Sequence, residues 1–130
     1  MTRTLTKEQM AACLKAQQGE VDAVAMYERL AKKVKDDADK KAFARLAGDE
    51  ARHAAVFQQY TNRVLKPKPT KRIAVPAMYR ILGKKRLYPI IAGKEYDAAD
   101  KYQHLIADFP EIESVMNDEV RHGDAVMGLL

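Results

Sequence analysis

Glutamate and histidine stand three residues apart at two places in the chain, as Glu50 with His53 and as Glu119 with His122. Residues with this spacing are neighbours on a helix surface, so each pair directs a carboxylate oxygen and an imidazole nitrogen towards one point. Oxygen and imidazole ligands without thiolate suit iron or manganese, and they are also compatible with zinc. The two pairs therefore indicate metal chemistry inside a helical structure.

Glu50 and His53 continue an apolar stripe. With them included, residues recur at alternating steps of three and four, namely Phe43, Leu46, Glu50, His53, Phe57, Tyr60 and Val64. This spacing is typical of the buried face of an amphipathic helix. The stripe predicts that two polar side chains lie on a buried surface, where something must satisfy them.

The chain contains an internal repeat that adds one glutamate to each pair. The segment "GEVDAVAMYERLA" matches "KEYDAADKYQHLI" when Glu20 is aligned with Glu95, and "DEARH" then matches "DEVRH" further along the chain. Each half thus carries a stripe glutamate on one predicted helix and Glu-x-x-His on the next. Four-helix bundles that bind two metals use this set of six ligands.

The periodic stripes predict four main helices. Thr6 and Gln9 form a capping box before the first helix, Asp36 or Asp37 caps the second, and Asp108 caps the fourth, with Pro110 in its first turn. The expected ranges are residues 6–35, 36–64, 88–105 and 108–130. The third helix starts at Tyr88 with Pro89 in its first turn.

Prolines interrupt the pattern between the second and third helices. Residues 65–76 form a connection rich in proline and lysine, in which Pro67 and Pro69 favour extended backbone. Pro76 suits the first turn of a short helix. With few glycines, and with helix-forming residues in excess, the chain is predicted to be all-α, a single domain over residues 1–130 built from two repeated helix pairs.

Buried carboxylates need a positive counterpart. Each unpaired one costs several kcal/mol, so four would cancel most of a net stability of about 5–15 kcal/mol. Two divalent cations would balance Glu20, Glu50, Glu95 and Glu119. The third histidine, His104, lies off the stripe of its helix and is predicted to be at the surface.

Composition excludes several other classes of protein. The basic residues that give a net charge of +5 are scattered, with small clusters at 66–72 and 84–86, and no recognition motif accompanies them, so no nucleic-acid partner is expected. Cys13 is the single cysteine, which excludes an intramolecular disulfide and a Cys-x-x-Cys site. No stretch is long and apolar enough to span a bilayer, which predicts a cytoplasmic protein with no membrane partner unless it was cut from a longer one.

The order Glu, Glu-x-x-His, Glu, Glu-x-x-His over nearly the whole chain resembles the rubrerythrin branch of the ferritin-like di-iron carboxylate superfamily. The resemblance implies a ferritin-like four-helix bundle in which Glu50 and Glu119 bridge two iron ions. It further implies that Glu20 and Glu95 are terminal ligands, and that each histidine binds one metal. Manganese and zinc are alternatives to iron.

Four more residues are candidates for positions around the metals. The paired D-E-x-R-H motif is similar to that of bacterial multicomponent monooxygenases, which implies that Asp49 and Asp118 hold the ligand histidines in one tautomer. Tyr27 and Tyr102 lie two turns beyond Glu20 and Glu95 and are candidates for hydrogen bonds to ligands or for electron relay. The alternative for both tyrosines is a core position in which the hydroxyl finds a partner.

The sequence departs from rubrerythrins in two respects. Rubrerythrins carry an extra glutamate three residues from the ligand on the third helix, where this chain has Ala92 and Ala98. They also usually carry a four-cysteine rubredoxin domain, which one cysteine cannot build. A peroxidase cycle here would therefore need an external electron donor.

The resemblance implies an oxidoreductase in which a di-iron site reacts with hydrogen peroxide or dioxygen, in oxidative-stress defence or iron handling. Ferroxidase activity is one alternative. Another is a non-catalytic module that binds or senses iron, similar to the rubrerythrin-like domains fused to membrane iron transporters. A metal-free helical scaffold is not expected, because it would leave four buried carboxylates without a cation.

The predicted fourth helix stops eight residues after His122, which leaves part of the bundle end uncovered. A homodimer is therefore expected. The long connection between the second and third helices allows either one bundle per chain or an exchange of helix pairs between two chains.

Overall fold

The computed structural model describes residues 4–130, and these residues form five helices and no strand. The helices are α1 (Lys7–Lys33), α2 (Asp37–Thr61), α3 (Pro69–Leu82), α4 (Lys84–Gln103) and α5 (Ile112–Met127). The predicted all-α class is confirmed. The chain divides into two compact units, one ending at Pro76 and one beginning at Ala77, and each is described by itself. The prediction of one domain over residues 1–130 stays a prediction.

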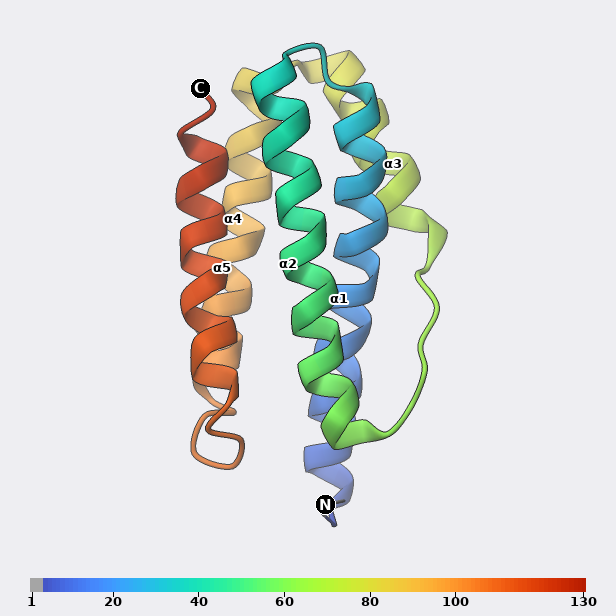
Figure 1. Ribbon diagram of the computed structural model, residues 1–130, viewed down its shortest axis with the longest axis vertical. Helices are drawn as coiled ribbons and strands as arrows, with labels where there is room; N and C mark the ends of the chain where they lie inside the picture. The colour runs from blue at the N-terminus through green and yellow to red at the C-terminus, as the bar shows by residue number, and fades with distance from the viewer. Residues whose placement is uncertain (1–3) are drawn as a thin grey trace. The chain divides into compact units, whose positions relative to one another are not determined.

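The first unit is built on the helix pair α1 and α2, which run side by side in opposite directions (Figure 1). The predicted capping box is present, because Thr6 Oγ1 accepts from Gln9 N and Thr6 N donates to Gln9 Oε1, both at 3.0 Å. Tyr27 of α1 stacks on Phe43 of α2 with ring centroids 5.8 Å apart, and both rings are fully buried. This aromatic pair anchors the two helices on their shared apolar face.

A polar network fastens the segment after α2 to α1. Thr61 Oγ1 donates to Gln17 Oε1 at 2.5 Å, and Gln17 Nε2 donates to the carbonyl oxygen of Arg63 at 2.8 Å. Asp22 accepts from the backbone N–H of Lys68 at 2.8 Å. Gln17 and Thr61 are buried, so their mutual hydrogen bond replaces the water that burial removes.

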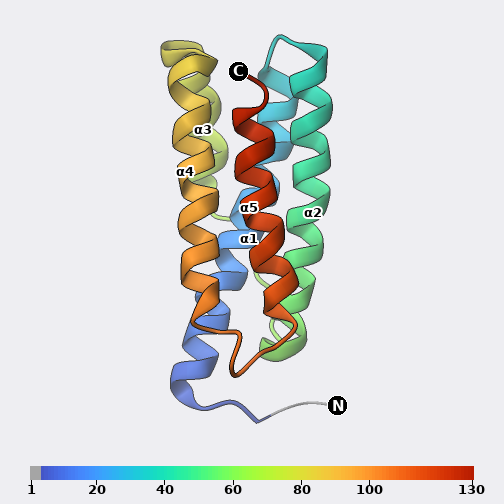
Figure 2. The same ribbon diagram turned by 90° about the vertical axis from the view of Figure 1, so that its left-hand side faces the viewer.

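The second unit contains the helix pair α4 and α5, which also lie side by side (Figure 2). Tyr88 of α4 is fully buried and stacks on Tyr79 with centroids 6.4 Å apart. Lys84 Nζ donates to the carbonyl oxygen of Leu129 at 3.1 Å, which ties the start of α4 to the residues after α5. Phe109, in the turn between the two helices, is fully buried.

Two predicted boundaries around the connection are wrong. Helix α2 ends at Thr61 because Asn62 adopts left-handed backbone, with φ 54°, so Val64 leaves the stripe and is exposed. Helix α3 begins at Pro69, whose missing N–H costs nothing in a first turn, and it runs through Pro76. Pro76 therefore lies inside the short helix and not at its start.

The starts of the last two helices also differ from the prediction. Helix α4 begins at Lys84, four residues before Tyr88, because Gly83 at φ 75° reverses the chain and Lys84 to Arg86 are good helix formers. Pro89 consequently lies inside α4. Helix α5 begins at Ile112 with Glu111 as N-cap, and not after Asp108, because the chain makes a further turn around the buried Phe109.

No helix among residues 4–130 is long and apolar enough to cross a bilayer.

We expect Thr61→Val to lower the free energy of unfolding by about 1–3 kcal/mol, because it removes the buried donor to Gln17 without changing the side chain's shape. Urea titration followed by far-UV circular dichroism measures the loss. The double variant Gln17→Leu, Thr61→Val should lose less than the sum of the two single variants, since neither polar partner then stays buried alone. A Thr61→Val loss within about 0.5 kcal/mol of zero would contradict this account.

Candidate metal centre

The first helix pair brings Glu20, Glu50 and His53 together. His53 Nδ1 lies 3.0 Å from Glu50 Oε1 on the same helix and 3.6 Å from Glu20 Oε2 on the facing helix. Helical spacing places Glu50 beside His53, and the packing of α1 on α2 adds Glu20. All three are at most 3% exposed, as the stripe predicted for Glu50 and His53. We call these residues the first triad.

The second helix pair repeats this arrangement with Glu95, Glu119 and His122, the second triad. His122 Nδ1 lies 3.4 Å from Glu119 Oε1 and 3.6 Å from Glu95 Oε2. These side chains are at most 6% exposed. In both triads the same ring nitrogen faces both carboxylates, so the sequence repeat is also a repeat of side-chain geometry.

The spacing within each triad fits ligands of one ion. Two ligand atoms that each lie about 2.1 Å from a metal, at angles between a right angle and a tetrahedral angle, are about 3.0–3.4 Å apart. The distances from Nδ1 to the carboxylate oxygens are 3.0 and 3.6 Å in the first triad and 3.4 and 3.6 Å in the second. Each triad can therefore close around a divalent cation with small side-chain movements.

The charge of each triad favours a cation. Two carboxylates and one imidazole carry a net charge of −2 when the histidine is neutral and −1 when it is protonated. Burial makes either negative charge costly, because the low dielectric removes solvation by water. A bound divalent cation would offset that cost.

The acidic residue before each Glu-x-x-His pairs with an arginine on its own helix. Asp49 accepts a hydrogen bond from Arg52, and Asp118 accepts one from Arg121. Both arginine side chains are 68% exposed, so these are surface ion pairs of i,i+3 type, which contribute little stability. The role of Asp49 and Asp118 towards the histidines stays a prediction.

Tyr27 and Tyr102 are both buried in the helix pair to which they belong. Tyr27 is part of the aromatic stack on Phe43. Their burial agrees with the core position that the sequence offered as one alternative, while an additional role towards the ligands stays a prediction.

A contact beside the second triad was not foreseen from the sequence. Tyr96, next to Glu95, donates from its hydroxyl to Asp124 Oδ1 at 2.6 Å. Gly123, next to His122, is buried, and a Cβ at this position would collide with the Tyr96 ring. A glycine inside a helix lowers stability by about 1 kcal/mol relative to alanine. Gly123 within the predicted helix was therefore a signal in the sequence that a neighbouring side chain packs closely there.

The Tyr96–Asp124 hydrogen bond fixes the position of α5 along α4 next to two members of the triad. This bond raises the pKa of the Tyr96 hydroxyl above its ordinary value of 10.0, and desolvation and the negative charge of Asp124 act in the same direction. The first unit has Val21 and Ala55 at the positions that the repeat aligns with Tyr96 and Asp124. The second triad thus has a support that the first lacks.

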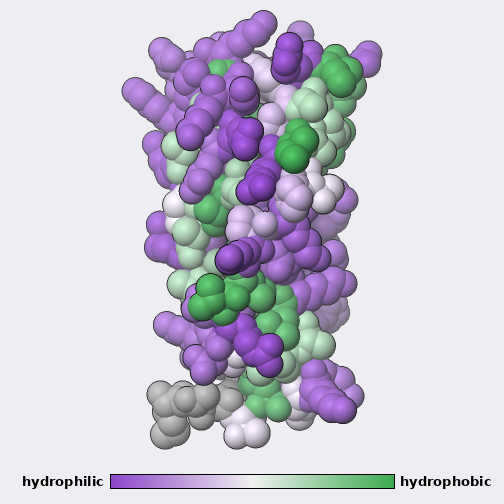
Figure 3. Space-filling model, turned by 90° about the vertical axis from the view of Figure 1, so that its right-hand side faces the viewer, coloured by the Kyte–Doolittle hydropathy of each residue, from purple (hydrophilic) through white to green (hydrophobic). Residues whose placement is uncertain are grey.

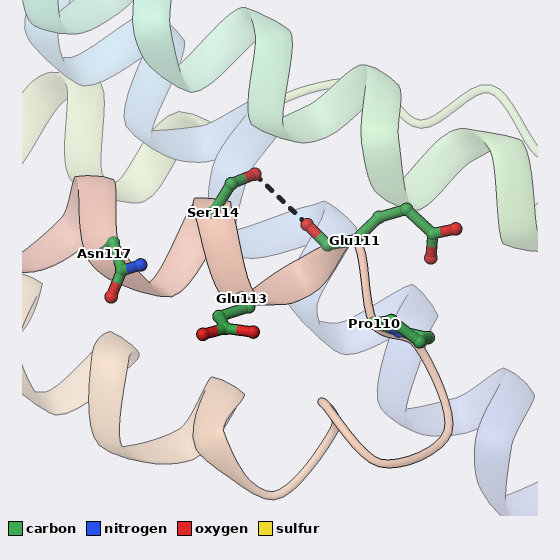
Figure 4. Close-up of a pocket in the computed structure, with 5 residues that line it drawn as sticks. All are labelled: Pro110, Glu111, Glu113, Ser114 and Asn117. Carbon is green, nitrogen blue, oxygen red and sulfur yellow. Dashed lines mark hydrogen bonds between the residues drawn. The ribbon is translucent and has the colours of Figure 1, made fainter.

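A shallow depression at the start of α5 does not contain any triad residue (Figure 4). It is lined by Pro110, Glu111, Glu113, Ser114 and Asn117. Ser114 Oγ donates to the carbonyl oxygen of Glu111 at 3.2 Å and thereby satisfies a backbone group at the helix start.

The fold and the triads define an all-helical carboxylate-and-histidine protein made of two equivalent helix pairs. Comparison with protein families agrees, because the rubrerythrin family model matches residues 13–130. The chain belongs to the rubrerythrin family. Searches of the curated proteins and of the solved structures gave no match.

We expect Gly123→Ala to lower the free energy of unfolding by about 1–3 kcal/mol, because the added methyl group overpacks the contact with the Tyr96 ring. Thermal and urea unfolding measure the change. In a Tyr96→Ala background the same substitution should instead stabilise the chain by about 1 kcal/mol, the helix propensity gain of alanine over glycine.

Gly93→Ala is the matched control for this pair of measurements. Gly93 lies in α4, and a Cβ there would meet nothing within 4 Å, so this substitution should be stabilising in both backgrounds. If Gly123→Ala were stabilising in the presence of Tyr96, the close contact would not constrain the helix pair.

Proposed function

We propose that the two triads join in one ferritin-like four-helix bundle and together bind two iron ions. The observation that carries this proposal is the repeat of one geometry in both helix pairs, with Nδ1 of a buried histidine facing two buried carboxylates. Membership of the rubrerythrin family supports the same arrangement. The joined helix pairs come from one chain or from two chains of a homodimer that exchange them, and both cases give the same six ligands.

Each ligand has a defined part in this proposal. By resemblance to the family, Glu50 and Glu119 would be shared by the two ions, and Glu20 and Glu95 would each bind one ion. His53 and His122 bind through Nδ1, the nitrogen that already faces the carboxylates. Four carboxylates balance the charge of two ferrous ions, and the oxygen and nitrogen donors suit iron and manganese.

The proposed activity is the reduction of hydrogen peroxide or dioxygen. When bound, two ferrous ions supply two electrons, which together with two protons convert one molecule of hydrogen peroxide into two of water. The chain's own residues hold the ions at a fixed site, keep that site away from bulk water and balance its charge. Residues 1–130 contain one cysteine, Cys13, so the returning electrons would come from a donor outside these residues.

The second candidate is an iron-handling protein, either a ferroxidase or a module that binds iron without turnover. Ala92 and Ala98 favour it, because neither can supply the extra carboxylate that rubrerythrins carry near the third-helix ligand. A ferroxidase would release the oxidised ions and not reduce them again in place, whereas the non-catalytic module would bind or sense iron without oxidising it.

We expect two iron ions per chain after anaerobic loading with ferrous iron and removal of excess metal, measured by inductively coupled plasma mass spectrometry. His53→Ala and His122→Ala should each reduce the bound iron, and the variant Glu50→Ala, Glu119→Ala should bind almost none. The thermal midpoint of the wild type should rise with added ferrous iron, since a ligand that binds only the folded state stabilises by about 2.7 kcal/mol at 100 times its Kd.

His104→Ala is the control for histidine loss, because His104 is exposed and lies outside both triads. It should bind as much iron as the wild type and show the same rise in thermal midpoint. Equal iron content in the wild type and in the Glu50→Ala, Glu119→Ala variant would exclude the proposed site.

We expect hydrogen peroxide to oxidise the iron-loaded protein faster than dioxygen does, as measured by stopped-flow absorbance with each oxidant in turn. The rubrerythrin family supports this order. Faster reaction with dioxygen would favour the ferroxidase. The absence of reaction with either oxidant, with two ions bound, would favour the non-catalytic module.

A further inference from the structure

The middle of the chain is strongly basic and has no acidic residue. Residues 51–94 contain eleven lysines and arginines and no aspartate or glutamate, whereas residues 95–130 contain two basic and nine acidic residues. Positive and negative charges are therefore unevenly distributed along the chain, although the net charge is only +5. Most of the excess positive charge lies in and around α3.

Helix α3 also exposes apolar side chains. Ile73 is 60% exposed and Ile81 is 81% exposed, and Ala77 between them is exposed as well. These positions follow one another at steps of four residues, so they lie along one side of the helix. Tyr79, on the opposite side of the helix, is buried. One side of α3 thus carries an exposed apolar stripe.

Exposed cations surround this stripe. Lys66, Lys68, Lys71, Arg80, Lys85 and Arg86 are all exposed and lie on α3 or within a few residues of its ends. Figure 3 shows apolar groups at the surface among hydrophilic side chains. Helix α3 and its flanking residues therefore combine an exposed apolar side with six exposed positive charges, and residues 51–94 contain no acidic residue.

We propose that α3, through Ile73, Ala77 and Ile81 and the cations around them, binds the surface of a bilayer that contains anionic phospholipid. Apolar side chains that lie in the plane of the lipid headgroups and lysines or arginines that meet anionic lipid add their contributions in this mode of binding. Val64, 82% exposed in the segment before α3, can add to the apolar contact. This proposal departs from the expectation of no membrane partner, which rested on the absence of a spanning segment.

The apolar stripe on α3 favours anionic lipid over nucleic acid as the partner. Binding to nucleic acid gains from positive charge and from aromatic side chains that stack on bases, but it gains little from exposed isoleucine. The exposed large apolar residues of α3 are both isoleucines. The combination of aliphatic side chains and surrounding cations is what an anionic bilayer complements.

Co-sedimentation of the full chain with lipid vesicles tests the proposal. The wild type should bind vesicles made of equal parts phosphatidylglycerol and phosphatidylcholine at about 0.1 M salt, where charges are screened beyond about 10 Å, and should not bind vesicles of phosphatidylcholine alone. Ile73→Ser with Ile81→Ser should weaken partitioning by about tenfold or more. Lys71→Gln with Arg80→Gln should weaken it by about fivefold per charge. All four residues are exposed, and circular dichroism checks that the variants fold.

Lys32→Gln with Lys33→Gln is the matched control, because it removes two exposed charges at the end of α1. It should change partitioning by no more than about twofold. Equal losses in the control and in the α3 charge variant would overturn the proposal, as would unchanged binding of the isoleucine variant. Tighter binding to duplex DNA than to vesicles at the same phosphate concentration would overturn it in favour of nucleic acid.

Discussion

The burial of ionisable side chains on the faces that also form the core is the constraint on which the rest of this structure depends. Glu20, Glu50 and His53 occupy the inner side of one helix pair and are almost fully buried. Their stripes must pack, because the same faces carry Tyr27 and Phe43. The chain therefore cannot form its hydrophobic contacts without bringing negative charge together. A cation that binds the triads would turn this cost into stability that depends on metal.

The two helix pairs bury equivalent triads, but different contacts hold the two helices of each pair together. In the first pair, the buried hydrogen bond between Gln17 and Thr61 links α1 to the end of α2. In the second pair, Tyr96 lies against Gly123 and binds Asp124, one and two residues beyond His122. Neither support has a counterpart at the aligned positions of the other half. The two halves of the repeat therefore share the carboxylate oxygens and the histidine Nδ1 of the triads, but they differ in the residues that pack around them.

Charge is distributed unevenly along the chain. The triads gather carboxylates where a cation would bind, while the segment around α3 carries positive charge without any acidic residue. The proposed metal site and the proposed lipid-binding surface use different residues, because the triads are buried and the stripe of α3 is exposed.

The sequence by itself determined the all-α class and the helix faces that carry the six candidate ligands. Helical periodicity is a local property of the sequence, so polar residues that occupy positions on an apolar stripe can be recognised without the tertiary structure. The sequence misplaced the end of α2 and the starts of α4 and α5, since the left-handed Asn62, the turn at Gly83 and the buried Phe109 depend on contacts beyond the local pattern. Only the tertiary structure decided which atoms meet. Packing of α1 on α2 and of α4 on α5 places Nδ1 of each histidine near two carboxylates, and packing of α4 on α5 also brings Tyr96 against Gly123. Contacts across a helix pair are set by interhelical packing and not by spacing along one helix.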